Sequence, residues 1–179
     1  MTAINLHAGH VLLSPYTEDH DAQTVEWLNS PELQQTFGIN RVVSRETHRR
    51  WMEAAKNTIV WAILIDNVGH CGNVLLHCND RHNSAYFQIY LGDISVRGKG
   101  TGRTVLRLVL DHAFGPLNLH RVWLHTLTGN KAAEQLYRST GFVEEGLERD
   151  ALFRDGQYES QRRWSLLADD WSRSKRDNP

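Results

Sequence analysis

A glycine-rich segment at residues 97–102 constrains this chain more than any other feature. It reads Arg-Gly-Lys-Gly-Thr-Gly and lies between an apolar run at residues 86–91 and a helical apolar pattern at residues 101–114. Glycine lets the backbone turn tightly and lets a ligand approach peptide N–H groups. The first turn of a helix presents unpaired N–H groups and the positive end of a dipole. With its two cationic side chains, the segment predicts a phosphate cradle between a strand and a helix.

Two other kinds of glycine loop fail on spacing. A dinucleotide-binding loop needs G-x-G-x-x-G, whereas residues 98–102 alternate their three glycines and Arg103 follows. A P-loop needs G-x-x-x-x-G-K-[ST], but the only Gly-Lys pair is followed by Gly100. Taken alone, the segment leaves an ordinary glycine-rich turn as the alternative.

A second pattern follows the predicted helix. Residues 130–142 read Asn-Lys-Ala-Ala-Glu-Gln-Leu-Tyr-Arg-Ser-Thr-Gly-Phe. Together with Arg97, Gly100 and Gly102, this order resembles the GNAT superfamily of acyl-CoA-dependent N-acyltransferases, whose signatures are [RQ]-x-x-G-x-[GA] and N-x-x-A-x-x-L-Y-x-x-x-G-F. Every fixed position of both signatures is matched. The resemblance is strong over residues 85–167, and its closing stretch looks like the branch that acetylates ribosomal-protein N-termini, spermidine and amino-sugar nucleotides.

Length and charge agree with a compact enzyme. The 179 residues suit one domain with a full core. The formal net charge of −1 gives no global field that would call for nucleic acid or an anionic membrane. No apolar run approaches the ~20 residues that cross a bilayer, and no secretory signal is visible at the start. The sequence therefore predicts a cytoplasmic protein without nucleic-acid or membrane partners.

The cysteines and histidines predict neither a disulfide nor a metal site. Cys71 and Cys78 fall in one predicted strand, about 23 Å apart at ~3.3 Å per residue. They cannot bridge each other there and are typical of small buried apolar residues. Histidine pairs such as His77 and His82 lack a third ligand at a recognisable spacing, so no metal is expected.

Apolar periodicity and turn residues predict one mixed α/β domain of the α+β type. The expected domain covers residues 1–171, and residues 172–179 form a flexible polar tail. The resemblance implies a central mixed and mostly antiparallel sheet, flanked by helices, with a V-shaped splay between the two central strands. Strands are expected at residues 10–15, 59–65, 71–78, 86–91, 121–127, 143–153 and 157–167, the last two joined by a turn at residues 154–156. Helices are expected from residue 17 to a break at Ser30-Pro31, after a cap at Ser44, at residues 101–114 and at residues 130–140.

The resemblance assigns acetyl-CoA binding to the end of the strand before the glycine loop, to the loop and to the helix start. Pantetheine would pair with the backbone of residues 91–96, where a backbone N–H would polarise the thioester carbonyl. Asn130 would contact the cofactor and also cap its helix. The expected cofactor-binding residues are Leu91, Asp93, Ile94, Val96, Arg97, Gly98, Lys99, Gly100, Thr101, Gly102, Arg103 and Asn130.

The resemblance also assigns the catalytic residue. Tyr137, the tyrosine of the L-Y-x-x-x-G-F pattern, would donate a proton to the departing thiolate. A helix tyrosine packed in the core is the alternative, since aromatic residues at helical spacing are usually core residues.

The general base is not assigned by the pattern. Many relatives carry a glutamate where Tyr86 stands, and a neutral phenol with a reference pKa of ~10 is a poor base near neutral pH. Asp93 at the strand end and His125 on the expected neighbouring strand are candidates. A water chain without a dedicated side chain is an equal alternative.

These features predict an acetyl-CoA-dependent N-acetyltransferase that acts on a primary amine by direct attack in a ternary complex. The expected acceptor is an amino-sugar nucleotide, another small amine, or a protein or peptide N-terminus, and its specificity elements should lie in residues 14–56. Spermidine is less favoured, because a polyamine site needs clustered carboxylates. A non-catalytic acyl-CoA-binding module on the same fold is the alternative, kept open by the missing strand glutamate. The sequence leaves a homodimer and longer acyl groups open.

Overall fold

The computed structural model describes residues 3–37, 41–154 and 156–177. They divide into two compact units, and each is described by itself. Unit 1 combines the chain up to His77 with Gln88–Val105, and unit 2 combines Cys78–Phe87 with the chain from Leu106 onward. Strands β4 (Gly69–Asn79) and β5 (Ser84–Leu91) and helix α4 (Thr101–Phe114) continue from one unit into the other. The prediction of a single domain over residues 1–171 concerns both units together and stays a prediction.

The strands of unit 1 form an antiparallel series. β1 (Leu6–Ala8) pairs with β2 (Val11–Pro15), β2 pairs with β3 (Thr58–Ile65), and β3 pairs with β4. Fully buried Trp61 anchors β3, and its indole N–H donates to the carbonyl of Ile4 at 2.8 Å. The predicted strands in this part are confirmed, but the short β1 was missed because three residues carry too little periodicity to indicate a strand.

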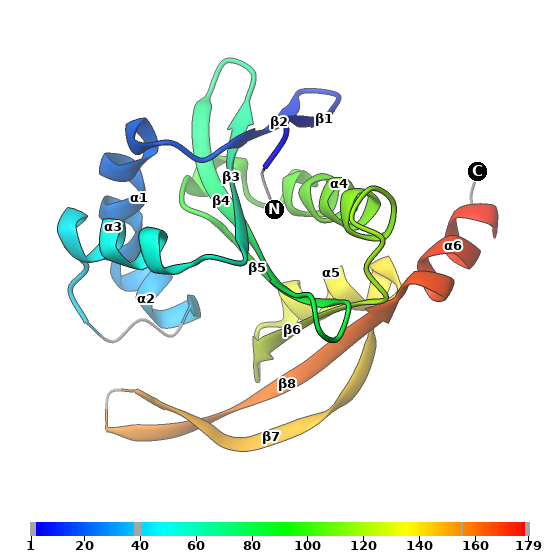
Figure 1. Cartoon of the computed structure of the whole chain (residues 1–179). Coiled ribbons are helices and arrows are strands. Elements are labelled where there is room, and N and C mark those ends of the chain that lie inside the picture. Colours follow the sequence, from blue (N-terminus) through cyan, green and yellow to red (C-terminus); the bar gives the residue numbers. More distant parts are fainter. Residues whose placement is uncertain (1–2, 38–40, 155, 178–179) are drawn as a thin grey trace. The chain divides into compact units, whose positions relative to one another are not determined.

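Helices α1, α2 and α3 gather beside β3 and β4 (Figure 1). A single 3₁₀ turn, η1 (Glu18–His20), leads into α1 (Asp21–Leu28), and α2 (Pro31–Phe37) follows almost at once. The predicted break at Ser30-Pro31 is confirmed, since α1 ends at Leu28, but the second helix that begins at Pro31 was missed. Proline suits that position, where its missing N–H would have no helical partner. The predicted cap of α3 (Arg45–Ala54) is confirmed, since Ser44 Oγ accepts from the N–H of Thr47 at 3.1 Å.

In unit 2, the strands run in the order β5-β6-β8-β7. β5 pairs in parallel with β6 (Arg121–Leu127), whereas β6 pairs antiparallel with β8 (Gln157–Leu167), which pairs antiparallel with β7 (Val143–Arg154). β7 and β8 form a long hairpin (Figure 1). Its predicted turn is consistent with the strand ends, although Asp155 lies outside the described residues. Helix α6 (Ala168–Asp177) extends into the segment predicted as a tail.

The predicted fold class is confirmed. The eight strands are ordered β1-β2-β3-β4-β5-β6-β8-β7, with antiparallel pairs predominating and helices between them along the chain. The parallel pairing of β5 with β6 joins Ser84–Tyr86 to Arg121–Trp123, the first three residues of each strand. The expected splay concerns the later residues of these strands and stays a prediction. Among the described residues, no helix is long and apolar enough to span a membrane.

Candidate active site

The glycine loop adopts a conformation that depends on its glycines. It follows a 3₁₀ turn, η2 (Ile94–Val96), and enters α4 at Thr101. Gly98 and Gly100 have φ values of +73° and +85°, in the left-handed region that side-chain-bearing residues rarely adopt. A Cβ atom at either position would meet no protein atom within 4 Å, so the space beside this backbone is open to a ligand. The loop therefore fits the predicted phosphate cradle.

Side-chain contacts hold the loop on unit 1. The guanidinium of Arg97 donates through Nε to the carbonyl of Leu91 at 2.9 Å and pairs with Glu32 of α2. Thr101 Oγ1 donates to the carbonyl of Val96 at 3.1 Å. Arg97 thus positions the loop with a charge that a carboxylate already balances, while Lys99 and Arg103 are exposed beside it.

The strand end before the loop has one backbone donor that is already occupied. The N–H of Asp93 donates to the carbonyl of Cys71 at 3.1 Å, so it is not available to polarise a thioester. The carboxylate of Asp93 accepts from the N–H of Ser95 at 2.8 Å, and the hydrogen bonds from Ser95 lower its pKa. A carboxylate with a lowered pKa is a weaker base, which counts against Asp93 as the general base. Ile94, by contrast, leaves 66% of its surface exposed next to the cradle.

In unit 2, helix α5 (Lys131–Thr140) carries the predicted proton donor. Asn130 caps it, since its Oδ1 accepts from the N–H of Ala133 at 3.2 Å, and Gly141 ends it at a φ of +99°. Tyr137 is 6% exposed and lies edge-on to Phe142 and Phe87, with ring centroids 5.6 and 6.5 Å away. Burial raises the pKa of the Tyr137 phenol, which therefore stays protonated near neutral pH.

A cluster of aromatic and charged side chains lies on β5, β6, β7 and β8 of unit 2. The ring of Tyr86 lies 4.5 Å from that of Trp123 and 5.6 Å from that of His125, between centroids. His125 Nε2 lies 3.1 Å from Oε2 of Glu148, whose other oxygen pairs with Arg163 at 2.7 Å. Burial lowers the pKa of His125 and the neighbouring carboxylate opposes that shift, so the imidazole is neutral at pH 7. His125 is therefore able to accept a proton.

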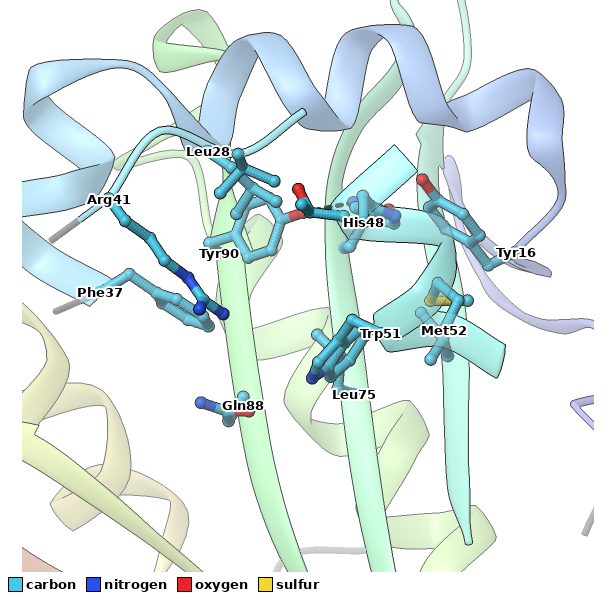
Figure 2. A pocket seen from close by; sticks show the side chains of 14 residues that line it. Tyr16, Leu28, Phe37, Arg41, His48, Trp51, Met52, Leu75, Gln88 and Tyr90 are labelled. Carbon is cyan, nitrogen blue, oxygen red and sulfur yellow. Dashed lines mark hydrogen bonds between the residues drawn. The ribbon is translucent and has the colours of Figure 1, made fainter. Parts of the chain in front are cut away.

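Unit 1 contains a pocket of about 420 Å³, within the range of small-molecule sites. We call it the aromatic pocket (Figure 2). Its walls come from the end of β2, from α1, α2 and α3, and from one face of β3, β4 and β5. The apolar part of its lining includes Leu28, Phe37, Trp51, Met52, Leu75 and Tyr90.

A hydrogen-bond network fixes the walls of the aromatic pocket. The hydroxyl of Tyr90 accepts from Asn73 Nδ2 at 2.6 Å, and Asn73 Oδ1 is bonded to His70 at 2.9 Å. The hydroxyl of Tyr16 donates to Asp21 at 3.0 Å. Desolvation by burial, and to a smaller extent this hydrogen bond, raises the pKa of the Tyr16 phenol. These rings are therefore held in place before any ligand arrives.

The aromatic pocket was missed at the level of residues, although the sequence analysis placed specificity in residues 14–56. Tyr16, Trp51 and Tyr90 are far apart in sequence, and nothing in their spacing indicates that they meet. The cap at Ser44 was a local signal that correctly set the start of α3, the helix that carries Trp51.

The two cysteines and the potential metal ligands of the described residues were also compared with the predictions. Cys71 and Cys78 are buried free thiols, as predicted, and burial raises the pKa of Cys71 to about 12. Across residues 3–37, 41–154 and 156–177, no group of three or more histidine, cysteine or acidic side chains is placed to hold a metal ion.

A family model described as an acetyltransferase (GNAT) domain matches residues 10–143. The chain belongs to the GNAT acetyltransferase family. Spermidine N(1)-acetyltransferase of Vibrio cholerae serotype O1 is 33% identical to this GNAT protein over 148 residues, 79% of this chain and 78% of the relative. The putative ribosomal N-acetyltransferase YdaF of Bacillus subtilis is 31% identical over 105 residues, 59% of this chain and 57% of the relative.

A solved structure agrees with the family. The crystal structure of spermidine N-acetyltransferase from Vibrio cholerae in complex with CoA and spermine superposes with a TM-score of 0.85 and 25% identity. It covers 91% of this GNAT chain and 98% of that one. The protein is thus an N-acetyltransferase with acetyl-CoA as its co-substrate, and the alternative of a non-catalytic module loses its support.

The structure places the predicted site residues in two groups. The residues from Leu91 to Arg103 form one continuous segment of unit 1, whereas Asn130 and Tyr137 lie on α5 of unit 2. Their roles toward acetyl-CoA stay predictions.

Proposed function

We propose that this GNAT enzyme acetylates a small primary amine by direct attack on acetyl-CoA, with the amine held in the aromatic pocket of unit 1. The observation that carries the cofactor half of this proposal is the glycine loop. Its two left-handed glycines and the following α4 helix leave backbone N–H groups open to an anion. The acetyl-CoA diphosphate supplies such an anion.

The transfer needs two proton movements. The amine lone pair forms the new C–N bond at the thioester carbonyl carbon, and the C–S bond breaks with its electron pair staying on sulfur. The sulfur takes a proton from the Tyr137 hydroxyl, and the nitrogen loses a proton to a base or to water. Direct attack is supported by the state of the cysteines, because both thiols are buried and the pKa of each is raised.

Tyr137 suits the donor role in one respect and is limited in another. Its raised pKa keeps the proton in place until a thiolate forms. The same shift makes the phenol a weaker acid, so the transfer gains from a thiolate that has lost its solvent shell. Tyr137 then recovers its proton from solvent after each turnover.

The relatives supply the first candidate amines. One is named a spermidine N(1)-acetyltransferase and another a putative ribosomal N-acetyltransferase. Among the amines that the relatives' names suggest, spermidine rests on the longest match, since that relative matches 79% of this chain. Amino-sugar nucleotides rest on the sequence resemblance alone.

The proposed function is tested by incubating the protein with acetyl-CoA and one amine at a time. The panel contains spermidine, a peptide with a free N-terminus, an amino-sugar nucleotide and phenylalanine, and released thiol is followed with a chromogenic reagent. We expect amine-dependent thiol release, with a matching mass increase of one acetyl group on the amine. Acetyl-CoA binding without thiol release on any amine would contradict the proposal and return the acyl-CoA-binding module as the better explanation.

A further inference from the structure

The aromatic pocket differs in charge from a site built for a polyamine. Among the described residues that line it, none is an aspartate or a glutamate, and Arg41 brings a positive charge. The sequence from Leu33 to Arg45 also carries two arginines and no acidic residue. A polyamine would have to bury several ammonium groups here beside a guanidinium, and burying unpaired charges is costly.

Two carboxylates that contact the pocket lining or lie on its helices already have partners. Asp21 accepts from the hydroxyl of the lining residue Tyr16 at 3.0 Å and from Arg49 Nε at 3.1 Å. Glu32 on α2 pairs with Arg97 of the glycine loop. Neither is therefore free to balance a cationic ligand in the aromatic pocket.

The apolar walls of the aromatic pocket suit a flat hydrophobic body. The rings of Phe37 and Tyr90 meet edge to face with centroids 5.3 Å apart, and His48 stacks on Tyr16 at 5.7 Å. Trp51 lines the same pocket and leaves 39% of its surface exposed, so part of its ring is accessible to a ligand. Aromatic rings pack well in such surroundings.

His48 adds no charge to these walls near neutral pH. It is 6% exposed, its Nδ1 atom is turned toward Asp21 at 3.9 Å, and burial lowers its pKa. Among the described residues that line the aromatic pocket, Arg41 is thus the charged side chain.

A second donor lies on the same side of the aromatic pocket as Arg41. In Figure 2, Arg41, Phe37 and Gln88 occupy one side, opposite Trp51 and Met52. His77 Nδ1 is bonded to Thr58 Oγ1 at 2.9 Å, and His77 Nε2 lies 2.8 Å from Gln88 Oε1. With the Thr58 hydroxyl donating to Nδ1, Nε2–H donates to Gln88, and the amide N–H groups of Gln88 are left as donors for a ligand.

We infer that the aromatic pocket selects an acceptor that has a single primary amine, an apolar and preferably aromatic body, and a carboxylate that pairs with Arg41 and Gln88. An aromatic amino acid has this chemistry, whereas spermidine lacks both the body and the carboxylate. The inference rests on the proposed function, because it names the substrate class of the same site.

The test compares phenylalanine, phenethylamine and spermidine, since the first two differ only in the carboxylate. We expect kcat/KM for phenylalanine to exceed that for phenethylamine about 10- to 100-fold, the range of a hydrogen-bonded charge pair. Arg41→Gln should remove most of that difference by lowering kcat/KM for phenylalanine and not for phenethylamine. Arg45→Gln, which removes an exposed arginine outside the pocket lining, is the matched control and should keep the difference.

Calorimetric titration of the same three ligands into the wild-type protein with CoA separates two kinds of failure. Preferential binding of phenylalanine without turnover would contradict the proposed function, while the ligand preference inferred for the aromatic pocket would stand. Tightest binding or fastest turnover with spermidine would overturn the inference, as would a phenylalanine preference that survives Arg41→Gln.

Discussion

The imidazole of His125 and the carboxylate of Glu148 face each other in unit 2, with Nε2 and Oε2 3.1 Å apart. Arg163 holds the other oxygen of Glu148 at 2.7 Å, and Gln161 Nε2 donates to Glu148 at 2.6 Å. A histidine oriented by a fixed carboxylate is a recurrent arrangement for accepting a proton. We predict that this pair accepts the amine proton, the role that the resemblance gives to a glutamate at the position of Tyr86.

His125→Gln tests the imidazole as the base. We expect kcat/KM near neutral pH to fall about 10²-fold, the lower end of the range for general acid–base catalysis. The wild-type pH profile should have an acid limb below the ordinary histidine pKa of 6.5, because burial lowers the pKa of His125, and the variant should lose that limb. A limb that persists, with turnover within about twofold of wild type, would point to a water chain instead.

Two neighbouring substitutions are the controls for this prediction. The negative charge of Glu148 raises the pKa of His125, so Glu148→Gln should move the acid limb to lower pH rather than remove it. Tyr86→Phe should lower turnover only modestly and keep the shape of the profile. A collapse of activity in Tyr86→Phe would assign the phenol a direct catalytic role.

Gly100→Val tests the phosphate cradle. Valine at a φ of +85° is strained, and its side chain would project into the open space beside the backbone. We expect a loss of about 1–3 kcal/mol in stability from the strain and a sharp drop in acetyl-CoA affinity, measured by calorimetry.

Gly69 is a matched control for Gly100, because it also has a φ of +85° and open space around its Cβ position. Gly69→Val should lower stability by a similar amount to Gly100→Val without weakening the binding of acetyl-CoA. Equal affinities in the two folded variants would remove the cradle from the cofactor site.

Glu145→Gln tests an ion pair that joins three strands of unit 2. Both terminal nitrogens of Arg121 donate to Glu145, at 2.7 and 2.6 Å, and Ser165 donates to it at 2.8 Å. The Arg121 hydrogen bonds, with smaller contributions from Ser165, lower the pKa of Glu145 from 4.5 to about 2. Because Glu145 is partly exposed, solvent screening limits the expected decrease in the free energy of unfolding of Glu145→Gln at pH 7 to about 1 kcal/mol.

The pH dependence of that loss follows from the sign of the shift. A lowered pKa means that the ionised carboxylate stabilises the fold above pH 4.5, and that this contribution is lost as the pH falls toward about 2. Denaturant unfolding of the wild-type protein and of Glu145→Gln should show that the difference between their free energies of unfolding shrinks as the pH falls from 4.5 toward about 2. A difference that does not change with pH would mean that packing, rather than charge, is lost. Exposed Glu53→Gln is the control and should change stability less.

Tyr137→Phe removes only the proposed proton donor and keeps the ring against Phe87 and Phe142. We expect turnover to fall about 10²–10⁴-fold, with acetyl-CoA affinity and thermal stability nearly unchanged. Turnover within about twofold of wild type, in an assay limited by chemistry, would make Tyr137 a core aromatic. A collapse in affinity would instead make it a positioning residue for the co-substrate.

Local signals in the sequence predicted much of the fold. Asn130 and Gly141 mark the two ends of α5 through their capping chemistry, and the apolar spacing of α4 gave its bounds without error. The break at Ser30-Pro31 was predicted correctly, but α2 was missed, because a proline that follows one helix can also be the first residue of the next. Such a residue can be interpreted only with its neighbours in space.

The candidate site could be predicted only where its functional groups come from consecutive residues. The glycine loop is of this kind. The partner of Arg97, by contrast, is Glu32, 65 residues away, and the walls of the aromatic pocket come from elements spread between Tyr16 and Tyr90. Contacts of this type depend on tertiary packing, which no local pattern encodes.

Direct transfer from acetyl-CoA to a bound amine is the central claim, and initial-rate kinetics test it most directly. Acetyl-CoA and the best amine are varied together, and reciprocal rates are plotted at each fixed amine concentration. We predict intersecting lines, because both substrates must be bound before the C–N bond forms. Parallel lines, together with acetylated protein detected by mass after incubation with acetyl-CoA alone, would show a covalent acetyl-enzyme and contradict direct transfer.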